Sequence, residues 1–238
     1  MMKLHRGILL STALGMLGIA AHPVYASDSP DQPDTPRVCE AFVSLAIVLE
    51  VNATDNDGEV VVHVRSGNDG LRSLAIVGPG GRTLVAAAGR RNAIGYRDFI
   101  LESTEPADLK EVLRAFPAGK YLAYGTTVSG HCLKGTMQLS HVAAPATTLL
   151  APAAKAVVPV DGFVLRWTPV AGAVSYVITV DNEDRGTKLV AESAPNATSF
   201  VVPADWLEPA TSYTAAVAVK AATGNVSSVE IPVSTAAE

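Results

Sequence analysis

Cys39 and Cys132, the only cysteines of the chain, are the first residues whose types could do chemistry. In an exported protein, a single pair of cysteines favours one disulfide bond. Two free thiols, or a metal site that includes the neighbouring His131, are the alternatives. A structural zinc ion needs four ligands at short spacings, and these scattered residues do not supply them. The pattern therefore predicts a Cys39–Cys132 disulfide, with Cys39 opening the first strand and Cys132 at a hairpin tip.

A second candidate is the acidic turn Asp55-Asn56-Asp57-Gly58-Glu59. Calcium binds closely spaced oxygen ligands on a glycine-bearing loop, so Asp55, Asp57 and Glu59 are weak calcium candidates. The run lacks the full twelve-residue loop with its terminal bidentate glutamate. A hairpin turn accounts for the same residues, because Asp, Asn and Gly favour turns for backbone reasons alone. Apart from these weak candidates, the sequence predicts no metal and no cofactor.

Motifs for a nucleophile or a phosphate loop are missing from the sequence, as is a zinc-protease helix. Glu102 and Glu105 could form a carboxylate pair of the kind that glycosidases use. They flank a turn before a predicted helix, where solvated side chains are expected. Ser129 lies two residues from His131, but on a predicted hairpin tip that faces water. The sequence therefore predicts no catalytic residue.

The N-terminus predicts export. Residues 1–26 have a cationic start, an apolar run over 7–21 and the small-residue ending Val24-Tyr25-Ala26, as in a secretory signal peptide. The apolar run is shorter than the roughly 20 residues that span a bilayer. We expect cleavage after Ala26, a periplasmic or extracellular protein, and no stable membrane span afterwards. Residues 27–37, rich in proline and aspartate, are expected to form a disordered lead.

The charge and composition exclude some partners. The formal net charge is −5, and removal of the two cations in residues 1–26 makes it about −7. An acidic chain without a basic stripe is a poor partner for nucleic acid or for an anionic membrane. Aromatic residues make up only 5% of the chain, which weakens a carbohydrate-stacking surface. A protein partner is therefore expected ahead of a glycan.

Residues 38–144 are expected to form a β-sandwich domain with one short helix. The apolar alternation and the Gly, Pro, Asn and Asp turns predict strands at 41–51, 59–65, 71–77, 82–88, 97–103, 120–128 and 133–142. The helix is expected at 108–116, because Leu109, Val112, Leu113 and Phe116 fall on one face at helical spacing.

Residues 145–238 are expected to form a linker and a second β-sandwich. The Ala- and Pro-rich stretch 143–156 is expected to serve as the linker and as the lead into the first strand. Strands are predicted at 163–167, 175–180, 188–191, 199–202, 213–219 and 226–233. Trp167 ends the first of these and shares a face with its apolar neighbours, so it is expected in the core. Tyr213 ends a Leu-x-Pro-x-Thr-x-Tyr run, which is typical of a tyrosine corner whose phenol bonds to the backbone near Leu207 or Pro209.

With these residues in this order, the second half resembles fibronectin type III domains. The resemblance implies a β-sandwich scaffold and names no ligand, since one fold carries many functions. No Arg-Gly-Asp tripeptide occurs in the chain. Over about residues 40–145, segments such as Gly78-Pro79-Gly80-Gly81-Arg82 and Phe116-Pro117-Ala118-Gly119 are similar to those of a family of uncharacterised bacterial exported proteins. That resemblance implies no activity.

The sequence thus predicts an all-β chain of two tandem sandwiches that binds a macromolecule without catalysis. Loop ends and free sheet edges are the expected contact surfaces, with the hairpin tip Ala222-Thr223-Gly224-Asn225 first among the loops. The alternative is a small secreted hydrolase with its site in the first domain. That site would hold His63 or His141 beside Glu102 or Glu105.

Overall fold

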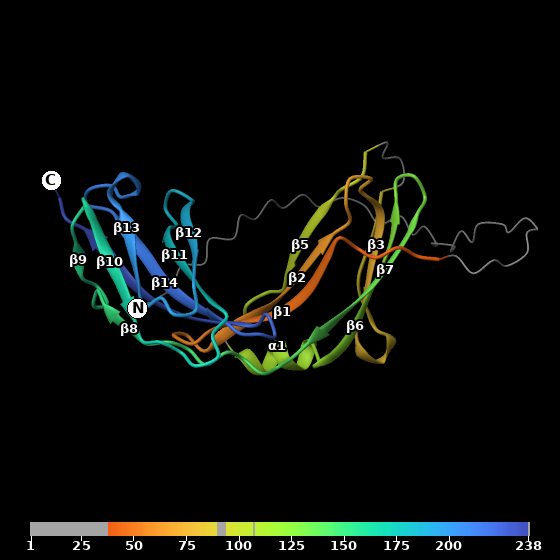
Figure 1. Ribbon diagram of the computed structural model, residues 1–238, viewed down its shortest axis with the longest axis horizontal. Helices are drawn as coiled ribbons and strands as arrows, with labels where there is room; N and C mark the ends of the chain where they lie inside the picture. Colours follow the sequence, from red (N-terminus) through yellow and green to blue (C-terminus); the bar gives the residue numbers. More distant parts are fainter. Residues whose placement is uncertain (1–37, 90–93, 107, 238) are drawn as a thin grey trace, which may run out of the picture. The chain divides into compact units, whose positions relative to one another are not determined.

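The computed structural model describes residues 38–89, 94–106 and 108–237 (Figure 1). The predicted signal peptide and the predicted lead lie outside these residues. The regular structure of the described chain is mostly β-strand, as the sequence predicts. It contains the strands and the α-helix expected from the apolar alternation, at nearly the expected bounds.

The elements of the first half are β1 (Ser44–Asn52), β2 (Asp57–Arg65), β3 (Leu71–Val77), η1 (Pro79–Gly81), β4 (Thr83–Ala88), β5 (Asp98–Glu102), α1 (Leu109–Ala115), β6 (Gly119–Thr127) and β7 (Cys132–Leu139). Those of the second half are β8 (Leu149–Ala151), β9 (Val157–Val158), β10 (Gly162–Trp167), β11 (Ser175–Asn182), β12 (Thr187–Ser193), β13 (Ser199–Pro203), η2 (Ala204–Trp206), β14 (Ser212–Lys220) and β15 (Val226–Thr235).

The first half is a sandwich whose two layers are β4-β3-β6-β7 and β1-β2-β5. Because side chains alternate along a strand, every second residue of each strand enters the space between the layers. The buried core contains Ile47, Leu49, Val60, Val62, Val64, Leu71, Leu74, Ile76, Tyr121 and Leu139. Asp108 caps the start of α1, because its carboxylate accepts a hydrogen bond from the Lys110 amide. The apolar face of the helix packs on the same core.

The second half is also a sandwich, with layers β13-β10-β8 and β12-β11-β14-β15. This is the strand arrangement that the resemblance to fibronectin type III domains implies. Trp167 is buried in its core, as predicted, and its ring lies 5.4 Å from that of Tyr176. The predicted tyrosine corner is present: the Glu208 amide donates to the Tyr213 hydroxyl at 2.9 Å. This bond fixes the chain just before β14. Within 143–156, expected as a linker and the lead into a first strand, β8 forms and pairs with β10, whereas the two-residue strand β9 was not predicted.

The layers β12-β11-β14-β15 and β1-β2-β5 are joined, because β15 pairs in parallel with β1 (Figure 1). The pairs are Glu50↔Val226, Val51↔Ser227 and Asn52↔Ser228. One continuous sheet therefore supplies a layer of each sandwich. Nothing in the sequence pattern predicts this pairing, because the two strands are far apart in the chain.

Asn225 completes the junction between the halves from the β14–β15 turn. It is 1% exposed, although the sequence predicts a hairpin tip there that is accessible to a binding partner. Its Oδ1 accepts a hydrogen bond from the Leu49 amide at 3.0 Å, and its Nδ2 donates to the carbonyls of Ser140 and Val142 at 2.8 and 2.9 Å. All three bonds reach backbone atoms of the first half or of the connection that follows it. The prediction was therefore wrong for Asn225, which is part of the junction.

Candidate functional site

The disulfide between Cys39 and Cys132 is present, as predicted. Cys39 does not open the first strand, because β1 begins only at Ser44. The segment before β1 instead runs along the start of β7: the Glu40 amide donates to the Cys132 carbonyl, and the Lys134 amide donates to the Glu40 carbonyl, each at 2.9 Å. The bond thus ties the N-terminal end of the described chain to the first sandwich.

Ser129 and His131 do not form a nucleophile–base pair. The Ser129 hydroxyl donates to the Asp69 carboxylate, while His131 Nδ1 lies 3.2 Å from a carboxylate oxygen of Glu40. The hydroxyls of Ser129 and Thr127 lower the pKa of Asp69, so this carboxylate stays an acceptor. The group lies on an exposed turn, as predicted, where these bonds order the connection between β6 and β7.

The two histidines of the hydrolase alternative lie in different surroundings. His141 Nε2 is 2.7 Å from the Phe116 carbonyl and therefore donates to it, which makes this imidazole a link between the end of α1 and the segment after β7. His63 is exposed on β2, on the sheet face opposite to the core. Glu102 ends β5 on that same face, and Glu105 follows in the connection to α1. Among the described residues, neither histidine is hydrogen-bonded to a serine hydroxyl.

Four carboxylates near β5 interact electrostatically and shift pKa values within the group: those of Glu50, Glu59, Glu102 and Glu105. Glu50 and Glu59 are directly opposite on β1 and β2, and Glu102 is opposite Val61 on the other side of β2. Partial burial, followed by the charges of Glu105, Glu102 and Glu50, raises the pKa of Glu59 to about 7. Burial and the charge of Glu102 also raise the pKa of Glu50. None of the four forms an ion pair within the part of the chain that the structure describes.

The calcium candidates lie at the turn between β1 and β2. Asp55 is in the turn itself, next to Asn56 with its positive φ of 61°, and Asp57 and Glu59 are on β2. Within residues 38–89, 94–106 and 108–237, no group of three or more His, Cys, Asp or Glu side chains is placed to hold a metal ion. Calcium at Asp55, Asp57 and Glu59 stays a prediction.

The side of the first sandwich between β4 and β5 is open, and we call it the open side. β4 is the last strand of its layer, and β5 is the last strand of the other. Two pockets enter the core between them. The Leu101 pocket, of about 270 Å³, is lined mainly by Val60, Val62, Ile76, Leu84, Val85, Leu101 and Phe116, with Arg82 and Glu102 also on its wall. The Phe99 pocket, of about 190 Å³, is lined by Leu71, Leu74, Ala87, Tyr96 and Phe99 among others.

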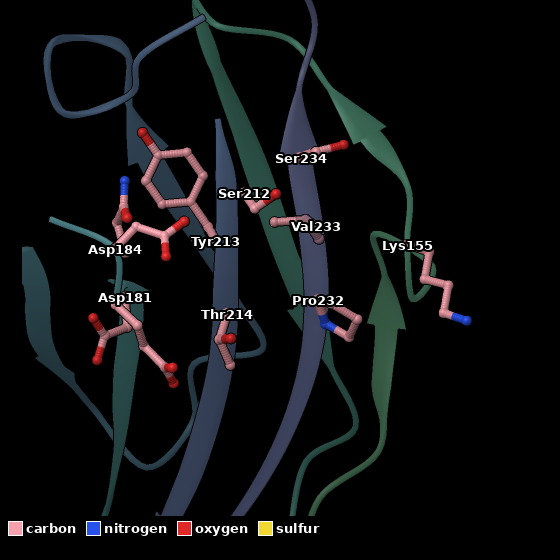
Figure 2. Close-up of a pocket in the computed structure, with 11 residues that line it drawn as sticks. Lys155, Asp181, Asp184, Ser212, Tyr213, Thr214, Pro232, Val233 and Ser234 are labelled. Carbon is pink, nitrogen blue, oxygen red and sulfur yellow. The ribbon is translucent and has the colours of Figure 1, made fainter. Parts of the chain in front are cut away.

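A third hollow, of about 360 Å³, lies over β14 and β15 in the second half (Figure 2). Figure 2 shows Ser212 and Thr214 next to Pro232 and Ser234, with Asp181 on the opposite side from Lys155. Its acidic side belongs to the β11–β12 hairpin, where Asp181 lies 3.8 Å from Lys188. The hollow is a polar, solvated part of the sheet surface, without the apolar walls of the open side.

The sequence located the open side only in part. The alternation in 97–103 predicts β5. The residues of a strand do not indicate, however, whether it has a neighbouring strand on both sides. Ile100, which is 57% exposed in the structure, is an ordinary apolar strand residue in the sequence and gave no signal of a free edge. Among the described residues, no helix is long and apolar enough to cross a membrane.

No protein-family model and no curated protein matches the chain. Similar solved structures include the FN1–FN3 domains of chicken CNTN1, with 13% identity and a TM-score of 0.35 over 83% of this chain and 65% of that one. Another is the fibronectin(III)-like modules of CbhA from Clostridium thermocellum, with 12% identity and a TM-score of 0.32 over 86% and 92% of the two chains. A two-domain fibronectin type III segment of chicken tenascin has 14% identity and a TM-score of 0.31 over 82% and 99%. At these values the sandwich fold rests on the strand order of the chain itself.

Proposed function

We propose that the chain is an exported, non-catalytic module, of the periplasm or the cell exterior, that binds a protein partner. Its two sandwiches, residues 38–144 and 145–238, would act as a joined scaffold, with the first one carrying the contact surface. Cys39–Cys132 supports export, because disulfides persist in oxidising compartments. The acidic net charge supports a protein partner over nucleic acid.

The open side of the first sandwich is the observation that carries this proposal. A free sheet edge and apolar pockets beside it are features through which proteins bind one another. Three of the residues considered for catalysis have other bonds: Ser129 with Asp69, His131 with Glu40, and His141 with the Phe116 carbonyl. These bonds stabilise turns and connections, so the geometry favours binding over hydrolysis.

Site-specific photocrosslinking in cells that export the chain tests the proposal. A photoreactive phenylalanine replaces Tyr96, which lines the Phe99 pocket, or Val201 on β13 as a control; both side chains are 65% exposed. We expect a discrete crosslinked protein from position 96 and none from position 201. Equal crosslinking from both positions would contradict a surface on the open side. Hydrolytic turnover that is lost when Ser129 or His63 is replaced would contradict the non-catalytic function.

A further inference from the structure

We propose that the free edge of β5 binds an extended strand of the partner protein, in which apolar residues alternate with lysine or arginine. The inference rests on the proposed function and specifies the partner that the open side accepts. Three independent features of the open side support it: the backbone groups of β5, the spacing of the two pockets, and the unpaired charge beside the edge.

The ladder between β2 and β5 leaves one set of backbone groups of β5 free. The Ser66 amide donates to the Arg97 carbonyl at 2.9 Å, and the Ser103 amide donates to the Val60 carbonyl at 3.0 Å. In an antiparallel pair, the N–H and C=O groups of one residue point to the same side and alternate along the strand. The odd-numbered residues from 97 to 103 therefore bond to β2. The N–H and C=O groups of Asp98, Ile100 and Glu102 point to the free edge, which has no neighbouring strand among the described residues.

The two pockets have the spacing of a bound strand. Phe99 and Leu101 are successive inward-facing residues of β5, and each lines one pocket. Residues two apart in an extended chain are roughly 6.7 Å from each other, and their side chains point the same way. A strand paired with β5 would therefore place alternate side chains toward the Phe99 and Leu101 pockets. Their apolar walls select aliphatic or aromatic residues for these positions.

The other side chains of such a strand would lie beside the acidic outer face of the sheet. Glu102 is on β5 itself, and Glu59 lies on the next strand. These two carboxylates and those of Glu50 and Glu105 have no ion-pair partner in the described chain, whereas the cation Arg65 already pairs with Asp98 at 3.2 Å. Charge complementarity thus selects cationic residues at the outward positions of the partner strand. Arg82, just before β4, lines the Leu101 pocket together with Glu102, but no ion pair joins the two side chains among the described residues.

A second copy of this chain fits the edge poorly. Two antiparallel β5 strands would bring the Asp98 and Glu102 side chains of each copy beside those of the other. Like charges placed opposite one another across strands are destabilising. A short edge strand with flanking carboxylates is a known way to avoid pairing with itself. The same charges leave the edge available to a strand of opposite charge.

The test uses the mature chain and a capped, fluorescein-labelled heptapeptide of alternating lysine and valine, followed by fluorescence anisotropy. Two variants form a matched pair. Ile100→Pro removes the N–H that points to the free edge and leaves the ladder to β2 intact, because proline is tolerated on that side of an edge strand. Ile100→Thr keeps the N–H and the branching at Cβ. Far-UV circular dichroism confirms that both variants are folded.

We expect saturable binding to the wild-type chain and to Ile100→Thr, and a loss of at least about tenfold in affinity for Ile100→Pro, since several edge hydrogen bonds are lost together. At pH 8, above the pKa of about 7 that the fold gives Glu59, Glu59→Gln and Glu102→Gln should each weaken binding by roughly two- to fivefold, the range of solvated ion pairs. A peptide of alternating glutamate and valine should not bind.

Equal binding of the lysine peptide to Ile100→Pro and Ile100→Thr would overturn the inference, because attraction by charge alone would then explain it. Absence of binding to the wild-type chain would also overturn it. Self-association that Ile100→Pro abolishes would show that the edge pairs with a second copy. A crosslinked partner at position 96 whose binding is unchanged by Ile100→Pro would overturn the strand pairing and leave the proposed function standing.

Discussion

Replacing Asn225 by alanine should uncouple the two halves of the chain. The change removes three hydrogen bonds that cross the junction. It leaves the amide of Leu49, a residue that is 1% exposed, without an acceptor. The carbonyl of Val142 belongs to an exposed residue and can bond to water instead. The cost therefore comes mainly from one buried donor and from the lost bonds themselves.

The magnitude follows from these groups. A buried donor without a partner costs about 1–3 kcal/mol, and each lost hydrogen bond contributes about 1 kcal/mol. With the exposed carbonyl re-solvated, the free energy of unfolding should fall by about 2–4 kcal/mol. At a urea dependence of about 2 kcal/mol per molar, the unfolding midpoint should fall by roughly 1–2 M.

Urea unfolding followed by two signals measures the uncoupling. Both tryptophans, Trp167 and Trp206, are in the second half, so their fluorescence reports that half alone. Far-UV circular dichroism reports the strands of both halves. We expect coincident transitions in the wild-type chain and separate ones in Asn225→Ala.

Asn182→Ala is the matched control for this experiment. Asn182 is also a buried asparagine, 3% exposed, but it bonds only within its own hairpin, to the Arg185 amide. We expect a loss of about 1 kcal/mol with the two transitions still coincident. If Asn225→Ala unfolds at the wild-type midpoint, or if both variants behave alike, Asn225 does not couple the halves.

Three further predictions concern single contacts. The folded chain raises the pKa of Glu59 from its ordinary value near 4.5 to about 7, so the folded state binds a proton that the unfolded state releases, and stability falls as the pH rises through this window. Glu59→Gln should therefore raise the melting temperature more at pH 8 than at pH 4; an equal gain at both would refute this. Replacing Cys39 and Cys132 by serine should lower the free energy of unfolding by about 2–4 kcal/mol in urea titrations, because the bond closes a long loop; an unchanged midpoint would show that it does not stabilise the fold. Tyr213→Phe should lose the bond from the Glu208 amide and about 1 kcal/mol, measured by tryptophan fluorescence, and a neutral result would deny the tyrosine corner a stabilising role.

The sequence predicted the elements well because each carries its own periodicity. Residues 59–65 were expected as a strand and belong to β2 (Asp57–Arg65), and the helix expected at 108–116 is α1 (Leu109–Ala115). In both cases apolar residues recur at the spacing of the element, and Asp108 supplies a cap. The bond of Tyr213 to the Glu208 amide was predictable for the same reason, since its motif is local.

Contacts between distant parts of the chain could not be predicted in this way. The parallel pairing of β15 with β1 joins residues that lie far apart in sequence, and no periodicity encodes a partner. Gly224-Asn225 has the composition of an exposed turn, and only the first half, packed against it, buries the asparagine. The open side could not be predicted from the sequence either, because it depends on the absence of a neighbour beside β5 among the described strands.

Amide hydrogen exchange, measured by NMR on the mature chain with and without the crosslinked partner, tests the central claim most directly. In the free chain, the amides of Phe99 and Leu101 should exchange slowly because they bond to β2, and those of Asp98, Ile100 and Glu102 should exchange fast. On binding, we predict that these three amides become protected by at least about tenfold, as ladder hydrogen bonds form. Protection confined to other surfaces, with the three β5 amides still exchanging fast, would contradict the binding of a partner at this edge.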